Sequence, residues 1–317
     1  MLPAFVRRAA TLVATAVVAS MAVFWLLSVV PGDPAQVALG LNASPDALAA
    51  QRAAMGLDQP LVLRYLDWIG GLFRGDFGVS VVSKLPVGPE ILDKVQVTLT
   101  LVFCALVVAL VIALPVGILS AIRARSADGV VVSAASQVGM SVPGFLVGML
   151  LVTVFSVRLG WFPAGGWVAP SDNFLEFLRH VTLPALALGA VQAAVLTRYV
   201  RSAVLEILRE DFIRTARSKG LRPLQALVVH GLRNAAVPVL TVTGVQLAAM
   251  LVGAVVIERV FVINGLGSML LDRVGSRDMV AVQGIVMVLV LLVLVINTLV
   301  DVLYTAIDPR LRTRVSQ

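Results

Sequence analysis

The chain has 317 residues, of which 59% are hydrophobic and 14% charged, with a mean hydropathy of +0.97. Globular domains carry about 25% charged residues, so a soluble protein with an ordinary core is excluded. The net charge of +7 does not indicate a nucleic-acid partner, because the basic residues are distributed by membrane side and not in one patch. The single cysteine, Cys104, excludes an internal disulfide.

Apolar stretches long enough to cross a bilayer recur along the chain, since a spanning helix needs about 20 mostly apolar residues. We predict an all-α integral membrane protein with six spans, at Ala9–Val30, Val97–Ala121, Val130–Phe155, Leu183–Val200, Ala235–Val256 and Val280–Tyr304. The first stretch is too long for the apolar region of a signal peptide, so we expect an uncleaved span. The expected parts are a cytoplasmic N-terminus with the first span (1–30), a structured extracytoplasmic segment (31–96), a five-helix core (97–308) with a cytoplasmic loop (201–234), and a cytoplasmic tail (309–317).

The lysines and arginines indicate the side of each connection. An even number of spans puts both termini on one side, and with both in the cytoplasm fifteen of the twenty-five basic residues face the cytoplasm. These are Arg7, Arg8, Arg123, Arg125, Arg198, Arg201, Arg209, Arg214, Arg217, Lys219, Arg222, Arg233, Arg310, Arg312 and Arg314. The short outer loops contain five: Arg158, Arg179, Arg259, Arg273 and Arg277. The long outer segment is not counted in the positive-inside rule, so the asymmetry predicts cytoplasmic termini.

The outer segment after the first span carries helix start and stop signals. Asp33 precedes Pro34 as a natural N-cap, Ser44-Pro45-Asp46 repeats the signal, and Gly56 ends the second helix. A third helix, Leu61 to Phe73, has a common apolar face but is too short to span, so we expect it to be interfacial. That face carries Leu61, Tyr65, Trp68 and Leu72. The segment is either a docking platform for an extracytoplasmic partner or a packing cap over the helix bundle.

Motifs for catalysis and for ATP binding are missing. The sequence has no His-Glu-x-x-His and no Gly-x-Ser-x-Gly, and His180 and His230 fall in or beside loops on opposite sides of the membrane, which excludes a shared metal site. A P-loop needs Gly-Lys followed by Ser or Thr, whereas Lys84, Lys94 and Lys219 are followed by Leu, Val and Gly. We therefore expect no catalytic, cofactor-binding or metal-binding residues, and any ATP must be bound by another chain.

The predicted spans contain almost no ionisable residues, which disfavours a proton- or sodium-driven carrier. Neutral polar residues recur instead, one in each of the last four spans: Gln137, Gln192, Gln246 and Asn297. They are candidates for lining a translocation path, but interhelical hydrogen bonds that hold the bundle together explain them equally well. Four prolines in or at the start of spans can kink helices: Pro115, Pro143, Pro184 and Pro238.

The loop between the fourth and fifth spans contains signals for a short amphipathic helix. Asp211 is placed to cap its positive end, Lys219 lies at the negative end, and Gly220 suits the residue that stops it. One face carries its apolar residues: Phe212, Ile213 and Ala216. A helix of about nine residues is marginal in water, so it must pack on something. The alternative is an ordinary basic inner loop resting on lipid headgroups.

Two stretches here match a known pattern: Phe212-Ile213-Arg214-Thr215-Ala216-Arg217-Ser218-Lys219-Gly220-Leu221, and His230-Gly231-Leu232-Arg233-Asn234-Ala235 with Pro238. They resemble the membrane-spanning permease subunits of ATP-binding-cassette (ABC) importers for dipeptides, oligopeptides and, in one branch, nickel. The resemblance covers nearly the whole chain, including Pro31-Gly32-Asp33-Pro34, Gly56-Leu57-Asp58-Gln59-Pro60, Gly75-Asp76-Phe77-Gly78 and Asp308-Pro309-Arg310. The wider family's Glu-Ala-Ala-x-x-x-Gly signature is kept only at Ala216 and Gly220.

The resemblance implies a type I importer permease in a prokaryotic inner or plasma membrane, with a coupling helix that docks on a separate ATPase by its apolar face. The implied coupling residues are Asp211, Phe212, Ile213, Arg214, Thr215, Ala216, Arg217, Lys219 and Gly220. It also implies a second homologous permease, two ATPase subunits or domains that bind ATP and Mg²⁺, and an extracytoplasmic substrate-binding protein, besides membrane lipid. We predict import of dipeptides or oligopeptides. The alternatives are a nickel or other small-solute permease and a membrane scaffold without transport.

Overall fold

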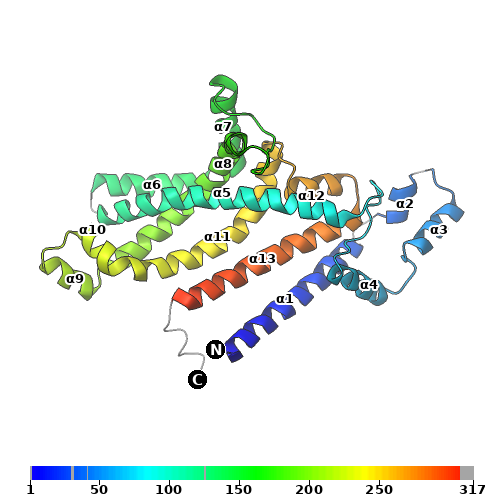
Figure 1. The fold of residues 1–317 in the computed structure, drawn as a ribbon, viewed down its shortest axis with the longest axis horizontal. Helices are drawn as coiled ribbons and strands as arrows, with labels where there is room; N and C mark the ends of the chain where they lie inside the picture. Colours follow the sequence, from blue (N-terminus) through cyan, green and yellow to red (C-terminus); the bar gives the residue numbers. More distant parts are fainter. Residues whose placement is uncertain (1, 30–31, 41, 125, 308–317) are drawn as a thin grey trace. The chain divides into compact units, whose positions relative to one another are not determined.

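The computed structural model describes residues 2–29, 32–40, 42–124 and 126–307, and its regular structure is helical. Figure 1 shows α1 (Leu2–Val29), α2 (Pro34–Leu39), α3 (Pro45–Ala54), α4 (Leu61–Phe73), α5 (Val87–Ile122), α6 (Ala127–Ser141), α7 (Gly144–Leu151), η1 (Val152–Arg158), α8 (Phe174–Ile207), α9 (Asp211–Ser218), α10 (Pro223–Ala226), η2 (Leu227–Gly231), α11 (Leu232–Val260), α12 (Leu266–Gly275) and α13 (Met279–Ile307); η1 and η2 are π-helical. In these residues the one β-type contact is an isolated bridge between Val79 and Pro86. The all-α prediction is confirmed. The predictions for Val30, Pro31, Asp308-Pro309-Arg310 and the tail 309–317 fall outside the described residues.

Five helices in the described part are long and apolar enough to cross a membrane: Ala9–Val29, Val87–Ile122, Phe174–Ile207, Pro223–Val260 and Met279–Val300. They contain five of the predicted spans, but the predicted starts at Val97, Leu183 and Ala235 are too late. Hydropathy identifies the part of a helix that suits lipid. It does not identify the more polar first turns of these helices, so the predicted starts come later than the observed ones.

The third predicted span, Val130–Phe155, is bent. The segments Ala134–Ser141 and Gly144–Arg158 meet at 93°, and the chain has six spans only if this pair counts as one. Pro143, between them, has no N–H to continue the helix and biases the preceding residue, Val142, towards the extended conformation that it adopts, with φ −85° and ψ 123°. The other three prolines of the spans lie inside helices that stay continuous: Pro115, Pro184 and Pro238.

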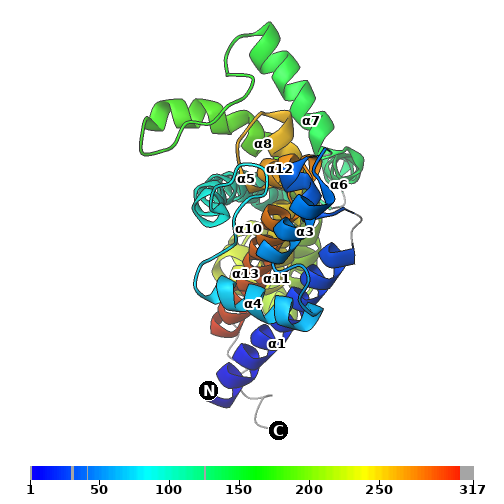
Figure 2. The ribbon, with the colours of Figure 1, turned by 90° about the vertical axis from the view of Figure 1, so that its right-hand side faces the viewer.

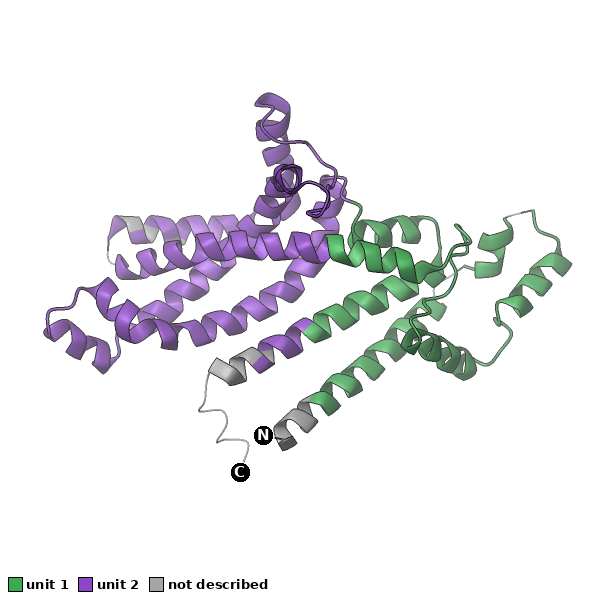
Figure 3. Ribbon diagram, viewed as in Figure 1, with its two compact units in different colours: residues 1–97, 264–295 green, residues 98–263, 296–317 purple. Residues whose placement is uncertain are grey.

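The chain divides into two compact units, coloured in Figure 3: unit 1 comprises residues 1–97 and 264–295, and unit 2 comprises 98–263 and 296–317. The core of unit 1 joins the starts of α5 and α13 to α12, through Val87, Ile91, Leu266, Met269, Ala281 and Ile285. α4 packs on α1, where the Phe24 ring lies 5.5 Å from the ring of Tyr65 and 5.7 Å from that of Trp68. These two members of the predicted interfacial face therefore cover part of α1.

The start and stop signals of the outer segment are confirmed. The Asp33 carboxylate accepts a hydrogen bond from the Ala35 amide (3.1 Å) at the start of α2, and the Ser44 hydroxyl accepts one from the Ala47 amide (3.3 Å) at the start of α3. α3 ends at Ala54, and Gly56 follows with a φ of +64°. Local side-chain chemistry therefore set these boundaries, as the sequence indicated.

Unit 2 is built around α8, which packs against α6, α7 and α11. Small residues bring α5 close to α8: a Cβ added to Gly189 would lie 2.7 Å from the carbonyl oxygen of Ala105, and one added to Gly117 would lie 2.6 Å from a Val200 methyl carbon. In Figure 2, α6 is seen nearly end-on whereas α7 with η1 runs across the view, in keeping with the 93° bend between them.

Candidate functional site

The loop after α8 forms α9 where the short helix was predicted. The residue at its N-cap is Glu210, with φ −64° and ψ 145° and no side-chain hydrogen bond, so the prediction that Asp211 caps the helix is wrong. Asp211 is instead the first helical residue. Its carboxylate still lies at the positive end of the helix, where a negative charge is stabilising.

The end of α9 is determined by Gly220, whose φ of +96° favours a residue without a Cβ. The Gly220 amide donates to the carbonyl of Arg217 (3.0 Å), and the Leu221 amide donates to the carbonyl of Ala216 (3.3 Å). These two bonds form a Schellman motif, which satisfies carbonyls of the last turn. The prediction that Gly220 stops the helix is confirmed.

The buried face of α9 packs inside its own chain. Ile213 is fully buried and Ala216 is 6% exposed, and both cluster with Ala226 against Leu208 and Leu221. The expectation that Ile213 and Ala216 dock on a partner is therefore wrong. An amphipathic pattern identifies the face that must be buried, but it does not identify what covers that face.

The opposite side of α9 is exposed to solvent. Phe212 is 40% exposed, and Arg214 and Asp211 form a loose 3.4 Å ion pair with side chains 71% and 95% exposed, which contributes little stability. We define the α9 surface as the exposed residues of the predicted set: Asp211, Phe212, Arg214, Thr215, Arg217, Lys219 and Gly220. A hollow of about 520 Å³ adjoins its start, lined by Ser202, Leu205, Glu206, Arg209, Glu210 and Asp211. The α9 surface is mostly charged and has one aromatic side chain, and the opposite face of the helix is packed against its own chain through Ile213 and Ala216.

Two of the four polar candidates in the spans meet. The Gln246 side-chain amide donates to the Gln192 side-chain oxygen (2.5 Å), which links α11 to α8. This contact supports the interhelical-bond alternative for that pair. Gln137 and Asn297 are exposed, and among the described residues neither is hydrogen-bonded to the pair. Gln137 lines a small cavity of about 20 Å³ with Ser120, Ser136, Thr197, Arg198 and Arg201.

Two buried carboxylates were not predicted from the sequence. Glu258, near the end of α11, is fully buried and accepts a 2.5 Å hydrogen bond from the hydroxyl of Thr98 on α5. Asp278, just before α13, is also fully buried and accepts hydrogen bonds from the Ser80 hydroxyl (2.5 Å) and the Val81 amide (3.2 Å). Each lies at the edge of an apolar stretch, and hydropathy alone does not distinguish a buried carboxylate there from one exposed at the membrane surface. The available signal was the position of Asp278 immediately before an apolar helix, which is typical of an N-cap.

Arg273 of α12 connects Asp278 to the start of α5. One guanidinium nitrogen lies 2.6 Å from Glu90 and the other lies 3.6 Å from Asp278, and the Arg273 side chain is 15% exposed. Because loss of one partner would leave a charge buried without compensation, such a cluster resists rearrangement. It ties α5, α12 and α13 together in unit 1.

The histidines do not form a site. His180 lies within α8, with its Nδ1 atom 2.9 Å from the carbonyl oxygen of Glu176, and His230 is exposed in η2, so the expected loop positions are wrong. The described residues include no group of three or more His, Cys, Asp or Glu side chains placed to hold a metal ion.

Comparison with known proteins gives consistent matches over nearly the whole chain. Residues 113–313 match the family described as binding-protein-dependent transport system inner membrane component, and residues 1–102 match its N-terminal membrane-component family. The glutathione transport system permease protein GsiC of Escherichia coli (strain K12) is 39% identical over 313 residues, covering 98% of this chain and 99% of that protein. A putative peptide transport system permease protein of Brucella abortus (strain 2308) is 39% identical over 306 residues, covering 96% and 98%.

The fold matches solved transporter structures at lower sequence identity. A structure of the MetNI methionine ABC transporter in inward-facing conformations aligns with a TM-score of 0.59 and 21% identity, covering 69% of this chain and 96% of that chain. A structure of an amino acid ABC transporter with histidines aligns with a TM-score of 0.52 and 18% identity, covering 69% and 94%.

Proposed function

The chain belongs to the family of inner membrane components of binding-protein-dependent transport systems, and we propose that it imports dipeptides or oligopeptides as one of two permease subunits in an ATP-driven complex. As a family member it is a multi-pass inner membrane permease of an ABC importer, and its fold is that of type I importer permeases. In the proposed complex the two permeases form the translocation path, and an extracytoplasmic binding protein delivers the substrate.

The names of the relatives support a peptide substrate. One is named for the transport of glutathione, which is a modified tripeptide, and another for the transport of peptides, and both cover almost all of this chain. The uptake experiment below includes nickel to test the alternative branch.

The observation that carries the coupling mechanism is the packing of α9. The helix is fixed by Ile213 and Ala216 from behind and ends in a Schellman motif, while the α9 surface stays exposed. A helix that is rigidly attached to its chain transmits the movement of a docked partner, whereas a flexible loop would absorb it. Because the sequence lacks a P-loop, we infer that two ATPase subunits bind ATP and Mg²⁺ and contact the α9 surface.

The proposed topology puts both termini and α9 in the cytoplasm, as the fifteen-to-five distribution of basic residues supports. Single cysteines introduced after Cys104→Ala test it with a membrane-impermeant thiol reagent. We expect labelling from outside at Asp46 and Asp172, and labelling only after permeabilisation at Ser126 and Ser218. External labelling at Ser218 would overturn both the topology and the coupling assignment.

Uptake by the reconstituted complex tests the transport function. The complex of both permeases and the ATPases is placed in vesicles with the binding protein, and labelled dipeptide, longer peptides, glutathione and Ni²⁺ are offered separately. We expect ATP-dependent accumulation of peptides. Accumulation of nickel alone would assign the chain to the nickel branch, and a complex that transports none of these solutes would refute the proposal.

A further inference from the structure

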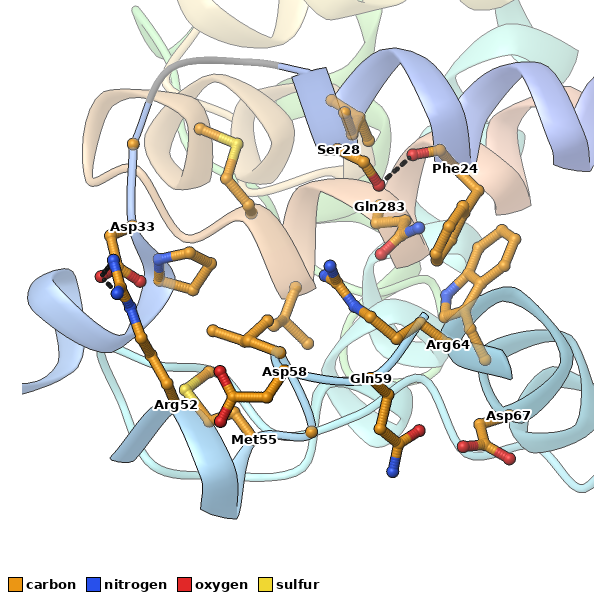
Figure 4. A pocket seen from close by; sticks show the side chains of 18 residues that line it. Phe24, Ser28, Asp33, Arg52, Met55, Asp58, Gln59, Arg64, Asp67 and Gln283 are labelled. Atoms are coloured by element: carbon orange, nitrogen blue, oxygen red, sulfur yellow. Dashed lines mark hydrogen bonds and ion pairs between the residues drawn. The ribbon is translucent and has the colours of Figure 1, made fainter. Parts of the chain in front are cut away.

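Unit 1 contains an open cavity of about 590 Å³ whose lining comes from the end of α1, from α2, from the segment between α3 and α4, from α4 and from the start of α13. Figure 4 shows the side chains that line it. Its volume lies within the range of about 300–1,000 Å³ that is typical of small-molecule sites. Neither the coupling mechanism nor the packing of the core requires a cavity of this size.

Two side chains of opposite charge lie in this cavity without a partner among the described residues. Arg64 extends from α4 into the cavity towards Gln283, and Asp58 projects from the turn between α3 and α4 (Figure 4). Neither side chain makes an ion pair or a hydrogen bond in the described structure, whereas the neighbouring Arg52 is already paired with Asp33 at 2.8 Å. The cavity therefore offers one free cation, Arg64, and two free carboxylates, Asp58 and Asp67, and none of these three is paired with another in the described structure.

The rest of the lining adds an apolar wall and an amide. Phe24 and Trp68 stand together with ring centroids 5.7 Å apart, and Met55 and Leu57 line the cavity as well. The Gln283 side chain points into the same space and has both a donor and an acceptor (Figure 4). A ligand that matches this lining has a carboxylate, an ammonium, an amide and an apolar side chain.

We propose that this cavity binds short peptides with free termini, with Arg64 pairing with the α-carboxylate and Asp58 accepting hydrogen bonds from the α-ammonium. The planar donor fork of arginine matches a carboxylate, and the aromatic wall lies within reach of a peptide side chain. The inference rests on the proposed function, which supplies the class of solute. In the proposed topology the cavity opens to the extracytoplasmic side, from which peptides arrive. It gives the permease a peptide contact of its own, outside the binding protein.

Equilibrium binding to the purified permease–ATPase complex in nanodiscs, without the binding protein, tests this site. The probes are tritiated Ala-Leu-Ala and its N-acetylated and C-amidated forms. Each cap removes one charge, and we expect each to weaken binding to the wild type by about tenfold, the value of one charge-assisted hydrogen bond. Arg64→Gln should abolish the discrimination against the amidated peptide only, and Asp58→Asn should abolish that against the acetylated peptide only. Arg74→Gln and Asp46→Asn, exposed and outside the lining, are the matched controls and should bind all three peptides as the wild type does.

Three results of the peptide-binding measurements would overturn the inference. They are no binding of the free peptide at millimolar concentration, equal binding of the free and capped peptides, and loss of both discriminations in each variant. Phosphatidylethanolamine carries the same two charges, so nanodiscs with and without it are compared. Competition by this lipid that Arg64→Gln removes would identify the cavity as a lipid-headgroup site and refute the peptide assignment. Peptide uptake in the vesicle assay without peptide binding in nanodiscs would refute this inference and leave the proposed function standing. Peptide binding in nanodiscs without uptake would refute the proposed function and leave this inference standing.

Discussion

Replacement of Gly220 tests whether α9 must end where it does. Gly220 has a φ of +96°, and nothing lies within 4 Å of the position that an added Cβ would take. Steric contact therefore adds nothing to the cost of a substitution, which comes from the backbone conformation alone. A residue with a Cβ in the left-handed region costs about 1–2 kcal/mol, and asparagine tolerates this region better than valine.

This cost predicts a graded loss of coupling. Because about 1.4 kcal/mol corresponds to a factor of ten in an equilibrium, Gly220→Val shifts the helix end about tenfold towards conformations without the two Schellman bonds. In vesicles that contain the reconstituted complex, we expect Gly220→Val to lower the ratio of peptide uptake to ATP hydrolysis by up to about tenfold. Gly220→Asn should lower the ratio less, and ATP hydrolysis should persist in both variants.

A matched control separates this mechanism from a general effect of backbone strain. Gly75 also has a positive φ, +76°, with nothing within 4 Å of its would-be Cβ, and it lies outside α9. Gly75→Val therefore has a similar backbone cost, and we expect it to keep the wild-type ratio. The reasoning is refuted if both Gly220 variants keep the wild-type ratio, or if Gly75→Val lowers the ratio as much as Gly220→Val does.

Three further predictions follow from contacts in the two units. Phe212→Asp, on the α9 surface, should weaken co-purification of the ATPase without changing the melting temperature of the permease. Ala216→Asp should lower the melting temperature because it buries an unpaired charge, and identical behaviour of the two variants would contradict the assignment of the two faces. Arg273→Leu should lower the melting temperature in detergent, because it leaves the fully buried Asp278 carboxylate without its cation. Breaking a tight, fully buried pair costs about 3–5 kcal/mol, and we expect less here because the Arg273–Asp278 contact is 3.6 Å and the other partner, Glu90, is 39% exposed; an unchanged melting temperature would show that the cluster is dispensable. Gln192→Leu and Gln246→Leu should each destabilise by about 0.6 kcal/mol, and the double variant by less than the sum in equilibrium unfolding; strict additivity would rule out a stabilising bond.

The helix ends were predictable where their cause is local. The N-caps at Asp33 and Ser44 and the stop at Gly220 each depend on residues within a few positions, so the sequence contains the whole signal. The break at Pro143 was only half predictable. A proline indicates that a kink is allowed there, but three other prolines in the spans leave their helices continuous, because surrounding contacts decide the outcome.

The long-range contacts were not predictable. The Ser80 hydroxyl and the Asp278 carboxylate that it binds are 198 positions apart, and Arg273 and Glu90 are 183 positions apart, so no window of sequence contains both partners. The residues that cover α9 were not predicted either, although they lie close to it in the sequence. The periodicity of Ile213 and Ala216 indicated a buried face, but the residues that bury it come from the helix before and the turn after, whose positions depend on the fold.

The right-angle break in the third span also affects how the protein is made. α6 has 15 residues, about 22 Å at about 1.5 Å per residue, which is less than the hydrocarbon thickness of about 30 Å. Because the segment after the break runs at 93° to the one before it, their lengths do not add along the membrane normal. We therefore expect neither piece to be inserted into the membrane as an independent span. Both α6 and α7 pack on α8, which follows them in the chain, so we expect this segment to assemble only after α8 has been synthesised.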